Sequence, residues 1–158
     1  MIIGVMGGAN VSAMDYKLAY ELGAEIADHG WILLNGGRDT GVMRASAEGA
    51  KSHGGITIGI LPGHSKTDAN PFIDIPVVTG LSDARNLVNV LSSDVVVACA
   101  GGAGTLSEVS LALKNRVPVI LMGLNTGDVF AEYEKLNLLT RADSPGECIQ
   151  QIQLRFSI

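Results

Sequence analysis

Residues 94–108, with the sequence DVVVACAGGAGTLSE, contain the pattern that decides the fold. The apolar run from Asp94 to Cys99 predicts a buried strand, and three glycines within four positions follow it closely. The residues from Ala103 to Asn115 then predict a helix whose inward face carries Leu106, Val109, Ala112 and Leu113. A strand, a glycine-rich loop and a helix in this order are typical of α/β sheets that bind a ligand.

The rest of the chain repeats this alternation. Apolar runs predict strands at 2–6, 31–34, 56–61, 73–78 and 118–122, and apolar spacing predicts helices at 41–53, 83–92, 128–135 and 145–156. The fourfold spacing of Met14, Leu18, Leu22 and Ile26 predicts a further helix on one face. These patterns indicate an α/β, Rossmann-like fold: a doubly wound, mainly parallel sheet of six or seven strands with helices on both faces. No linker or repeat interrupts residues 1–158, so we expect one domain.

Two segments depart from this regular pattern. Pro76 interrupts the run 73–78, which predicts an irregular or edge strand because proline cannot donate to a neighbouring strand. The stretch from His64 to Pro71 is polar and rich in turn residues, and we expect a mobile loop there.

Composition excludes several classes of protein. Apolar residues make up 47% of the chain and charged residues 17%, and the net charge is −5 with no basic run. This charge argues against nucleic-acid and membrane-surface binding. The two cysteines, Cys99 and Cys148, build no disulfide framework, and Cys99 is expected to be a small buried residue. No signal peptide or membrane-length apolar run is seen, so a cytoplasmic protein is expected.

The glycines gather after the predicted strands. Gly7-Gly8, Gly36-Gly37, Pro62-Gly63 and Gly101-Gly102 with Gly104 each follow a strand directly. Because the carboxyl ends of parallel strands meet at one edge of a sheet, these loops are expected to form one extended ligand site. Gly30 and Gly54-Gly55 fall at the opposite edge and are typical of helix ends.

The loop before the 103–115 helix predicts an anion site. Gly101, Gly102 and Gly104 would let phosphate oxygens reach the first helical amides, at the positive end of the helix dipole, and the Thr105 hydroxyl can add a bond. A structural alternative exists, because Thr105 and Glu108 also fit the capping-box pattern, which needs no ligand. The capping box leaves the three glycines unexplained.

Arg85 is the second candidate residue. It lies in the first turn of the predicted 83–92 helix, at the same edge of the sheet, where a cation opposes the dipole. A ligand anion in front of it would account for that position; a surface ion pair with Asp83 or a neighbouring residue is the alternative. Asn86 would bind the ligand or support the turn.

Other polar residues are weaker candidates. Arg38, Asp39 and Thr40 follow Gly36-Gly37 at the same edge, and are either ligand contacts or structural. Asp94 begins a strand at the opposite edge and is expected to be structural. His29 and His53 lie near helix ends and His64 lies in the loop; their spacing suggests no metal site.

Several common sites are absent. The first loop, Gly4 to Ala9, lacks the dinucleotide G-x-G-x-x-G pattern, and Asn35-Gly36 stands where an acid binding the ribose would be expected. The P-loop pattern with its lysine is also missing, which argues against ATP hydrolysis of that type. No Ser-His-Asp or Cys-His set is apparent.

With these residues placed, the chain from Met1 to roughly Gly123 resembles the LONELY GUY family, often labelled lysine-decarboxylase-like. Its hallmark, Pro-Gly-Gly-x-Gly-Thr-x-x-Glu after a helix carrying Arg-Lys, matches Ala100 to Glu108 and Arg85-Asn86. The resemblance implies that Arg85 and Glu108 are catalytic, that the glycine loop holds a phosphate, and that the protein is a homodimer or homotetramer. Family members include phosphoribohydrolases that release cytokinin bases from nucleoside monophosphates.

Two departures from the hallmark bear on function. Ala100 replaces the proline, and Asn86 replaces the lysine, which removes a cation from the site. The Arg-Asn form resembles a subgroup that includes molybdenum-cofactor carrier proteins, which bind a pterin bearing a phosphate. Two hypotheses follow: a carrier of a phosphorylated, nucleotide-like or pterin ligand such as the molybdenum cofactor, or a nucleoside 5′-monophosphate phosphoribohydrolase. No lysine has the setting that pyridoxal phosphate requires, so lysine decarboxylation is not expected.

Overall fold

The computed structural model describes residues 1–158. Its strands are β1 (Ile2–Met6), β2 (Ile32–Asn35), β3 (Ile56–Leu61), β4 (Ile75–Val78), β5 (Val95–Ala98), β6 (Val119–Met122) and β7 (Leu139–Ala142). Its α-helices are α1 (Ala13–Asp28), α2 (Gly41–Ser52), α3 (Arg85–Leu91), α4 (Ala103–Lys114), α5 (Ala131–Lys135) and α6 (Pro145–Phe156). Two 3-10 helices, η1 (Lys66–Asp68) and η2 (Ser82–Ala84), precede β4 and α3.

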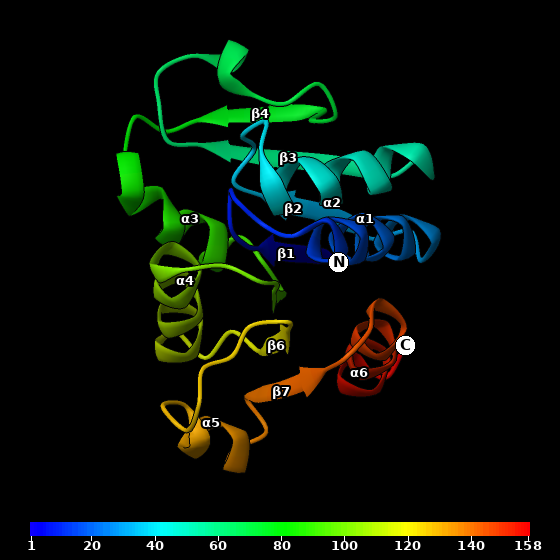
Figure 1. Ribbon diagram of the computed structural model, residues 1–158, viewed down its shortest axis with the longest axis vertical. Coiled ribbons are helices and arrows are strands. Elements are labelled where there is room, and N and C mark those ends of the chain that lie inside the picture. Colours follow the sequence, from blue (N-terminus) through cyan, green and yellow to red (C-terminus); the bar gives the residue numbers. More distant parts are fainter.

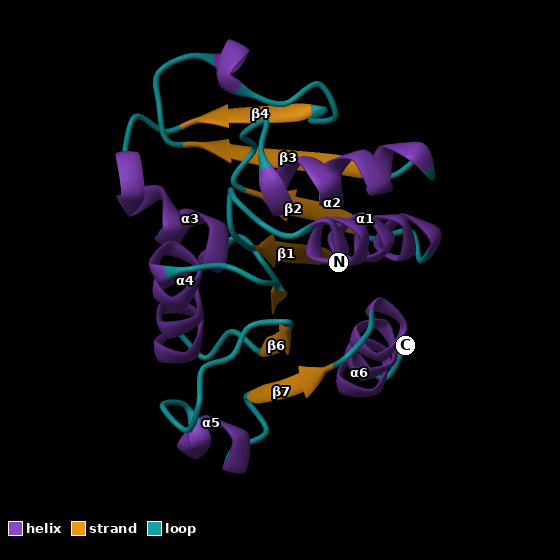
Figure 2. Ribbon diagram, viewed as in Figure 1, coloured by secondary structure: helices purple, strands orange, loops and turns teal.

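The seven strands form one sheet in the order β4-β3-β2-β1-β5-β6-β7, and every neighbouring pair is parallel. Helices cover both faces, with α1, α2 and α6 on one side and α3, α4 and α5 on the other (Figure 1; Figure 2). The predicted Rossmann-like α/β fold is confirmed.

Alternation along each strand builds the two cores. In β5, Val95 and Val97 pack towards α1, α2 and α6, while Val96 and Ala98 pack towards α4. Strands that are buried on both faces in this way need apolar side chains at every position, which is why the run 95–98 contains no polar residue.

Most predicted elements are present with shifted ends, but three expectations need correction. Met14 is 64% exposed and Leu106 is 38% exposed, so neither belongs to the inward face of its helix. Both lie in the first turn of a helix. The strand β7 was not predicted as an element, because its short sequence Leu-Thr-Arg-Ala lacks a continuous apolar run.

The segment between β3 and β4 differs from the other connections. It contains only the short η1 and no α-helix, and β4 forms the edge of the sheet, as Pro76 predicts. Asn70 is buried there and ties the segment to the loop after β2: its backbone amide donates to the Gly37 carbonyl at 2.9 Å, and its side-chain amide donates to the Arg38 carbonyl at 3.2 Å.

No helix of the fold is both long enough and apolar enough to cross a bilayer.

Candidate functional site

The strand order reverses between β1 and β5, since β2 lies on one side of β1 and β5 on the other. In doubly wound sheets this reversal opens a crevice at the carboxyl ends of the strands. A cavity of about 240 Å³ lies there, lined by Val5, Met6, Gly7, Gly8, Ala9, Gly36, Arg38, Met43, Asp83, Arg85, Asn86, Gly102, Gly104, Thr105 and Glu108. Loops that are far apart in the sequence therefore share one cavity, which we call cavity 1.

Cavity 1 collects ten of the twelve predicted site residues: Gly7, Gly8, Gly36, Arg38, Arg85, Asn86, Gly102, Gly104, Thr105 and Glu108. The other two, Gly37 and Gly101, lie outside its lining, and so does the Pro62-Gly63 loop. Gly37 has a positive φ of 73°, packs against Gly59 and donates its amide to the Asn35 side chain at 2.8 Å, which is a structural role. Gly101 lines a neighbouring cavity.

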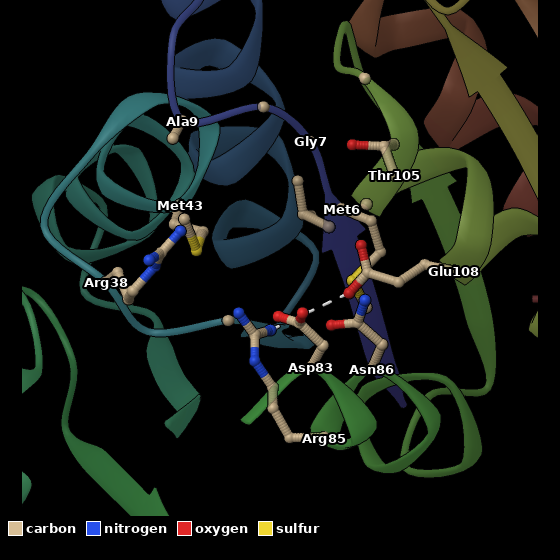
Figure 3. A pocket seen from close by; sticks show the side chains of 15 residues that line it. Met6, Gly7, Ala9, Arg38, Met43, Asp83, Arg85, Asn86, Thr105 and Glu108 are labelled. Carbon is tan, nitrogen blue, oxygen red and sulfur yellow. Dashed lines mark ion pairs between the residues drawn. The ribbon is translucent and has the colours of Figure 1, made fainter. Parts of the chain in front are cut away.

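Arg85 is a buried cation with few protein partners. Arg85 is only 9% exposed, and its Nε has no hydrogen-bond partner. The nearest acidic group is the Glu108 carboxylate, whose Oε1 lies 3.9 Å from the Arg85 Nη1 (Figure 3). Burial lowers the pKa of Arg85, partly offset by the Glu108 charge, yet a guanidinium stays protonated. The surface ion pair with Asp83 does not form, because no contact joins these two side chains within ion-pair distance.

Gly36 lies directly against the guanidinium of Arg85. A Cβ at this position would overlap both terminal nitrogens of the Arg85 guanidinium. The glycine after β2 therefore makes room for the arginine from α3, and the two elements meet at the base of cavity 1.

Glu108 faces Arg85 across the cavity (Figure 3). It is buried, and its Oε1 accepts a hydrogen bond from the Asn89 side-chain amide at 2.8 Å. Burial raises the pKa of Glu108, and the Asn89 bond and the Arg85 charge oppose that rise. The capping-box alternative is wrong: α4 begins after Gly102 with no side-chain cap, and Glu108 turns inward instead.

The first amides of α4 are free. No protein acceptor takes a hydrogen bond from the amides of Ala103, Gly104 or Thr105, while the Leu106 amide donates to Gly102 in the usual helical way. A Cβ added at Gly102 or Gly104 would meet no atom within 4 Å, so the space before these amides is open. Free amides at a helix start suit an anion.

The residues after β2 divide into two groups. Arg38 lines cavity 1. Asp39 pairs with Arg44 at 2.6 Å, and the Thr40 hydroxyl donates to the Ala9 carbonyl at 2.9 Å. Asp39 and Thr40 thus shape the loop, and only Arg38 adds charge to the cavity.

The remaining candidates are placed as follows. Asn86 lines cavity 1 and donates to the Ser107 hydroxyl at 3.2 Å. Asp94 accepts from the Ile2 amide at 2.7 Å, which confirms its structural role. His29 and His53 follow α1 and α2 at their C-terminal ends, and His64 is exposed and packs beside Gly80, outside cavity 1.

Sequence reasoning missed the buried polar partner of the site. Asn89 lies one helical turn after Arg85 and holds Glu108. Arg85 and Asn89 are four residues apart, which places them on one face of α3. This spacing could have predicted from the sequence that Asn89 faces the site. The apolar walls, Met6 and Met43, were also missed, because their sequence gives no sign that they face a cavity.

Comparison with known proteins identifies the family of this chain. The model of the SLOG cluster4 family matches residues 1–149. The chain belongs to the SLOG cluster4 family. This result, together with the relatives below, confirms the resemblance to LONELY GUY proteins and to the molybdenum-cofactor carrier subgroup.

Two solved structures match over almost the whole chain. The molybdenum cofactor binding protein of Rippkaea orientalis is 49% identical, with a TM-score of 0.92 over 98% of this chain and 96% of that chain. The molybdenum cofactor carrier protein of Chlamydomonas reinhardtii is 42% identical, with a TM-score of 0.91 over 99% and 98%. A cytokinin riboside 5′-monophosphate phosphoribohydrolase of Mycobacterium tuberculosis is 36% identical over 94 residues, which span 58% of this chain and half of that protein.

Proposed function

We propose that this protein binds and carries a phosphorylated small molecule in cavity 1, and that the molybdenum cofactor is that ligand. The observation that carries the proposal is the buried Arg85 guanidinium, whose Nε has no hydrogen-bond partner and which lines the same cavity as the open start of α4, with the Glu108 carboxylate 3.9 Å away. The likeness to two molybdenum-cofactor proteins over nearly the full chain supports the choice of ligand.

The phosphate group is the part of the ligand that these residues fit best. A buried charge without hydrogen bonds is costly, and charge-assisted bonds to phosphate offset that cost. The amides of Gly104 and Thr105 would receive the oxygens, Arg85 would balance the charge, and Arg38 would add a second cation at the rim.

The molybdenum itself would be bound through the ligand. The fold brings together no group of three or more His, Cys, Asp or Glu side chains suited to a metal ion. The protein would therefore hold the phosphate and the pterin, and the metal would be carried as part of the cargo.

Phosphoribohydrolase activity is the second candidate. Glu108 is buried beside Arg85, and a carboxylate placed there would bind ribose hydroxyls or stabilise positive charge at the anomeric carbon. The partial likeness to the mycobacterial phosphoribohydrolase supports it. Asn86 weighs against it, because it bonds to Ser107 and supplies no charge where the family hallmark has lysine.

The test is to measure binding and turnover on the same protein. Purified wild type is mixed with molybdenum cofactor, the free cofactor is removed, and the retained pterin is quantified by its fluorescence after oxidation. We expect retention by the wild type, a loss of about tenfold or more in affinity for Arg85→Ala, and no loss for Lys114→Ala, an exposed cation at the far end of α4.

A parallel incubation with AMP is analysed for free adenine. Intact AMP together with cofactor retention supports the carrier. Adenine release that disappears in Glu108→Gln would establish the hydrolase instead.

A further inference from the structure

A second cavity, cavity 2, lies beside cavity 1 and shares Ala9 with it. Its volume is about 530 Å³, and its lining is Ala9, Asn10, Val11, Ser12, Asp15, Tyr16, Gly41, Ala100 and Gly101. The same loops that enclose cavity 1, those after β1 and β5, therefore also form a wall of cavity 2. A ligand anchored at the start of α4 would have this second space within its reach.

Backbone atoms alone separate the two cavities where the loops touch. The Gly8 amide donates to the Ala100 carbonyl at 2.8 Å, and a Cβ at Gly8 would come within 3.1 Å of the Gly101 Cα. Since Gly8 lines cavity 1 and Gly101 lines cavity 2, this pair of glycines forms the ridge between them. A ligand that crosses the ridge meets no side chain from either glycine.

The two cavities differ in charge. Cavity 1 is lined by two arginines, Arg38 and Arg85, and by two carboxylates, Asp83 and Glu108, whereas Asp15 is the one charged residue that lines cavity 2. Asp15 is half-buried and its Oδ2 accepts from the Ser12 hydroxyl at 2.6 Å, but no protein donor bonds to its Oδ1. The Tyr16 hydroxyl is already engaged, donating to Glu48 at 2.8 Å. Cavity 2 thus offers a carboxylate acceptor and no cation.

We infer that cavity 2 holds the heterocycle of the ligand, with Asp15 accepting hydrogen bonds from a 2-amino-4-oxo edge of the kind that guanine and pterins share. Such an edge presents an amino group beside a ring N–H, and two parallel donors match a carboxylate as a guanidinium does. The phosphate would stay in cavity 1. This inference rests on the proposed phosphate site and adds the chemical class of the other end of the ligand.

The experiment compares three commercially available phosphates by calorimetry: ribose 5-phosphate, guanosine 5′-monophosphate and xanthosine 5′-monophosphate, in which an oxygen replaces the amino group. The wild type should bind the guanosine compound about tenfold or more tightly than either of the others. Asp15→Asn should lower the affinity for guanosine 5′-monophosphate about tenfold, so that the preference for it is lost, and should leave the affinity for ribose 5-phosphate unchanged. Asp128→Asn, an exposed aspartate outside both cavities, should behave as wild type.

Each other outcome overturns the inference in a recognisable way. Equal affinity for the three phosphates, or an Asp15→Asn variant that keeps the guanosine preference, would place the heterocycle elsewhere while the phosphate site stands. Loss of ribose 5-phosphate binding in a folded Asp15→Asn, checked by its melting temperature, would assign Asp15 to the phosphate end. No binding of any phosphate by the wild type would refute the proposed function and this inference together.

Discussion

Glu108 is a carboxyl group whose environment opposes its charge. It is buried beside the apolar Met6 wall, and one amide from Asn89 and the more distant Arg85 guanidinium offset only part of the desolvation. Burial therefore raises the pKa of Glu108 in the folded state. In the unfolded chain the same group titrates at its ordinary value, so the two states bind protons differently.

This difference predicts how stability depends on pH. Because the folded pKa of Glu108 is raised, its contribution is present below the ordinary glutamate pKa and is lost as pH rises through the folded pKa. The free energy of unfolding of wild type relative to Glu108→Gln should thus fall with rising pH, starting near pH 4.5. Urea unfolding of both proteins across that range measures it. Glu132→Gln, a control at an exposed glutamate, should show no such trend relative to wild type. The prediction is contradicted if the free energy of unfolding of wild type relative to Glu108→Gln increases as pH rises.

At the scale of elements, the N-cap residue of α4 is explained by ligand binding and not by the stability of the helix. Gly102 is the N-cap residue, and N-caps normally carry Ser, Thr, Asp or Asn. A side chain at Gly102 would meet no protein atom, so the backbone itself does not require glycine there. The glycine is better explained by the open space it leaves for a ligand.

Gly102→Asp is therefore expected to keep or raise the melting temperature and to weaken phosphate binding by about tenfold or more. The new carboxylate would cap α4 and at the same time occupy and repel the anion site. Calorimetry with ribose 5-phosphate and thermal unfolding measure the two effects. Gly146→Asp makes the same change in the first turn of α6, outside both cavities, and should leave binding unaltered. Undiminished binding by Gly102→Asp would argue that the ligand lies elsewhere.

At the scale of the whole molecule, one face of the sheet is incompletely covered. The β3–β4 connection supplies no α-helix, and Ile56 (50%), Ile75 (48%) and Leu91 (57%) are exposed on the side of α3. The parallel register places Ile58 beside Ile75 and Ile60 beside Val77, so this face is apolar. A second copy of the chain would bury such a surface.

Light scattering should accordingly give twice or four times the 16.4 kDa chain mass at micromolar concentration. Leu91→Glu should shift the mass towards one chain, because a buried charge without a partner is costly. Leu154→Glu, an exposed leucine on α6 at the opposite face, should leave the mass unchanged. A wild type that is monomeric would refute the homo-oligomer expected from the family resemblance.

The sequence by itself determined the fold class and the edge of the sheet that carries the site. Apolar runs and helical spacing are local signals, and they were sufficient because strands buried on both faces must be apolar throughout. Glycines after strands, and Arg85 at a helix start, placed most of the cavity 1 residues at one edge for the same local reason.

Only the tertiary structure decided which of those residues meet. Glu108 could equally have capped α4, and its pairing with Asn89 and Arg85 depends on how α3 packs against α4. The separation of Gly101 from Gly102 into different cavities depends on the contact between Gly8 and Gly101. These glycines lie in the loops after β1 and β5, two strands that are neighbours only in the folded sheet. The strand β7 likewise forms by pairing with β6, because its own sequence carries no continuous apolar run. Packing between distant segments leaves no periodic trace in the sequence, and therefore no local pattern could have predicted it.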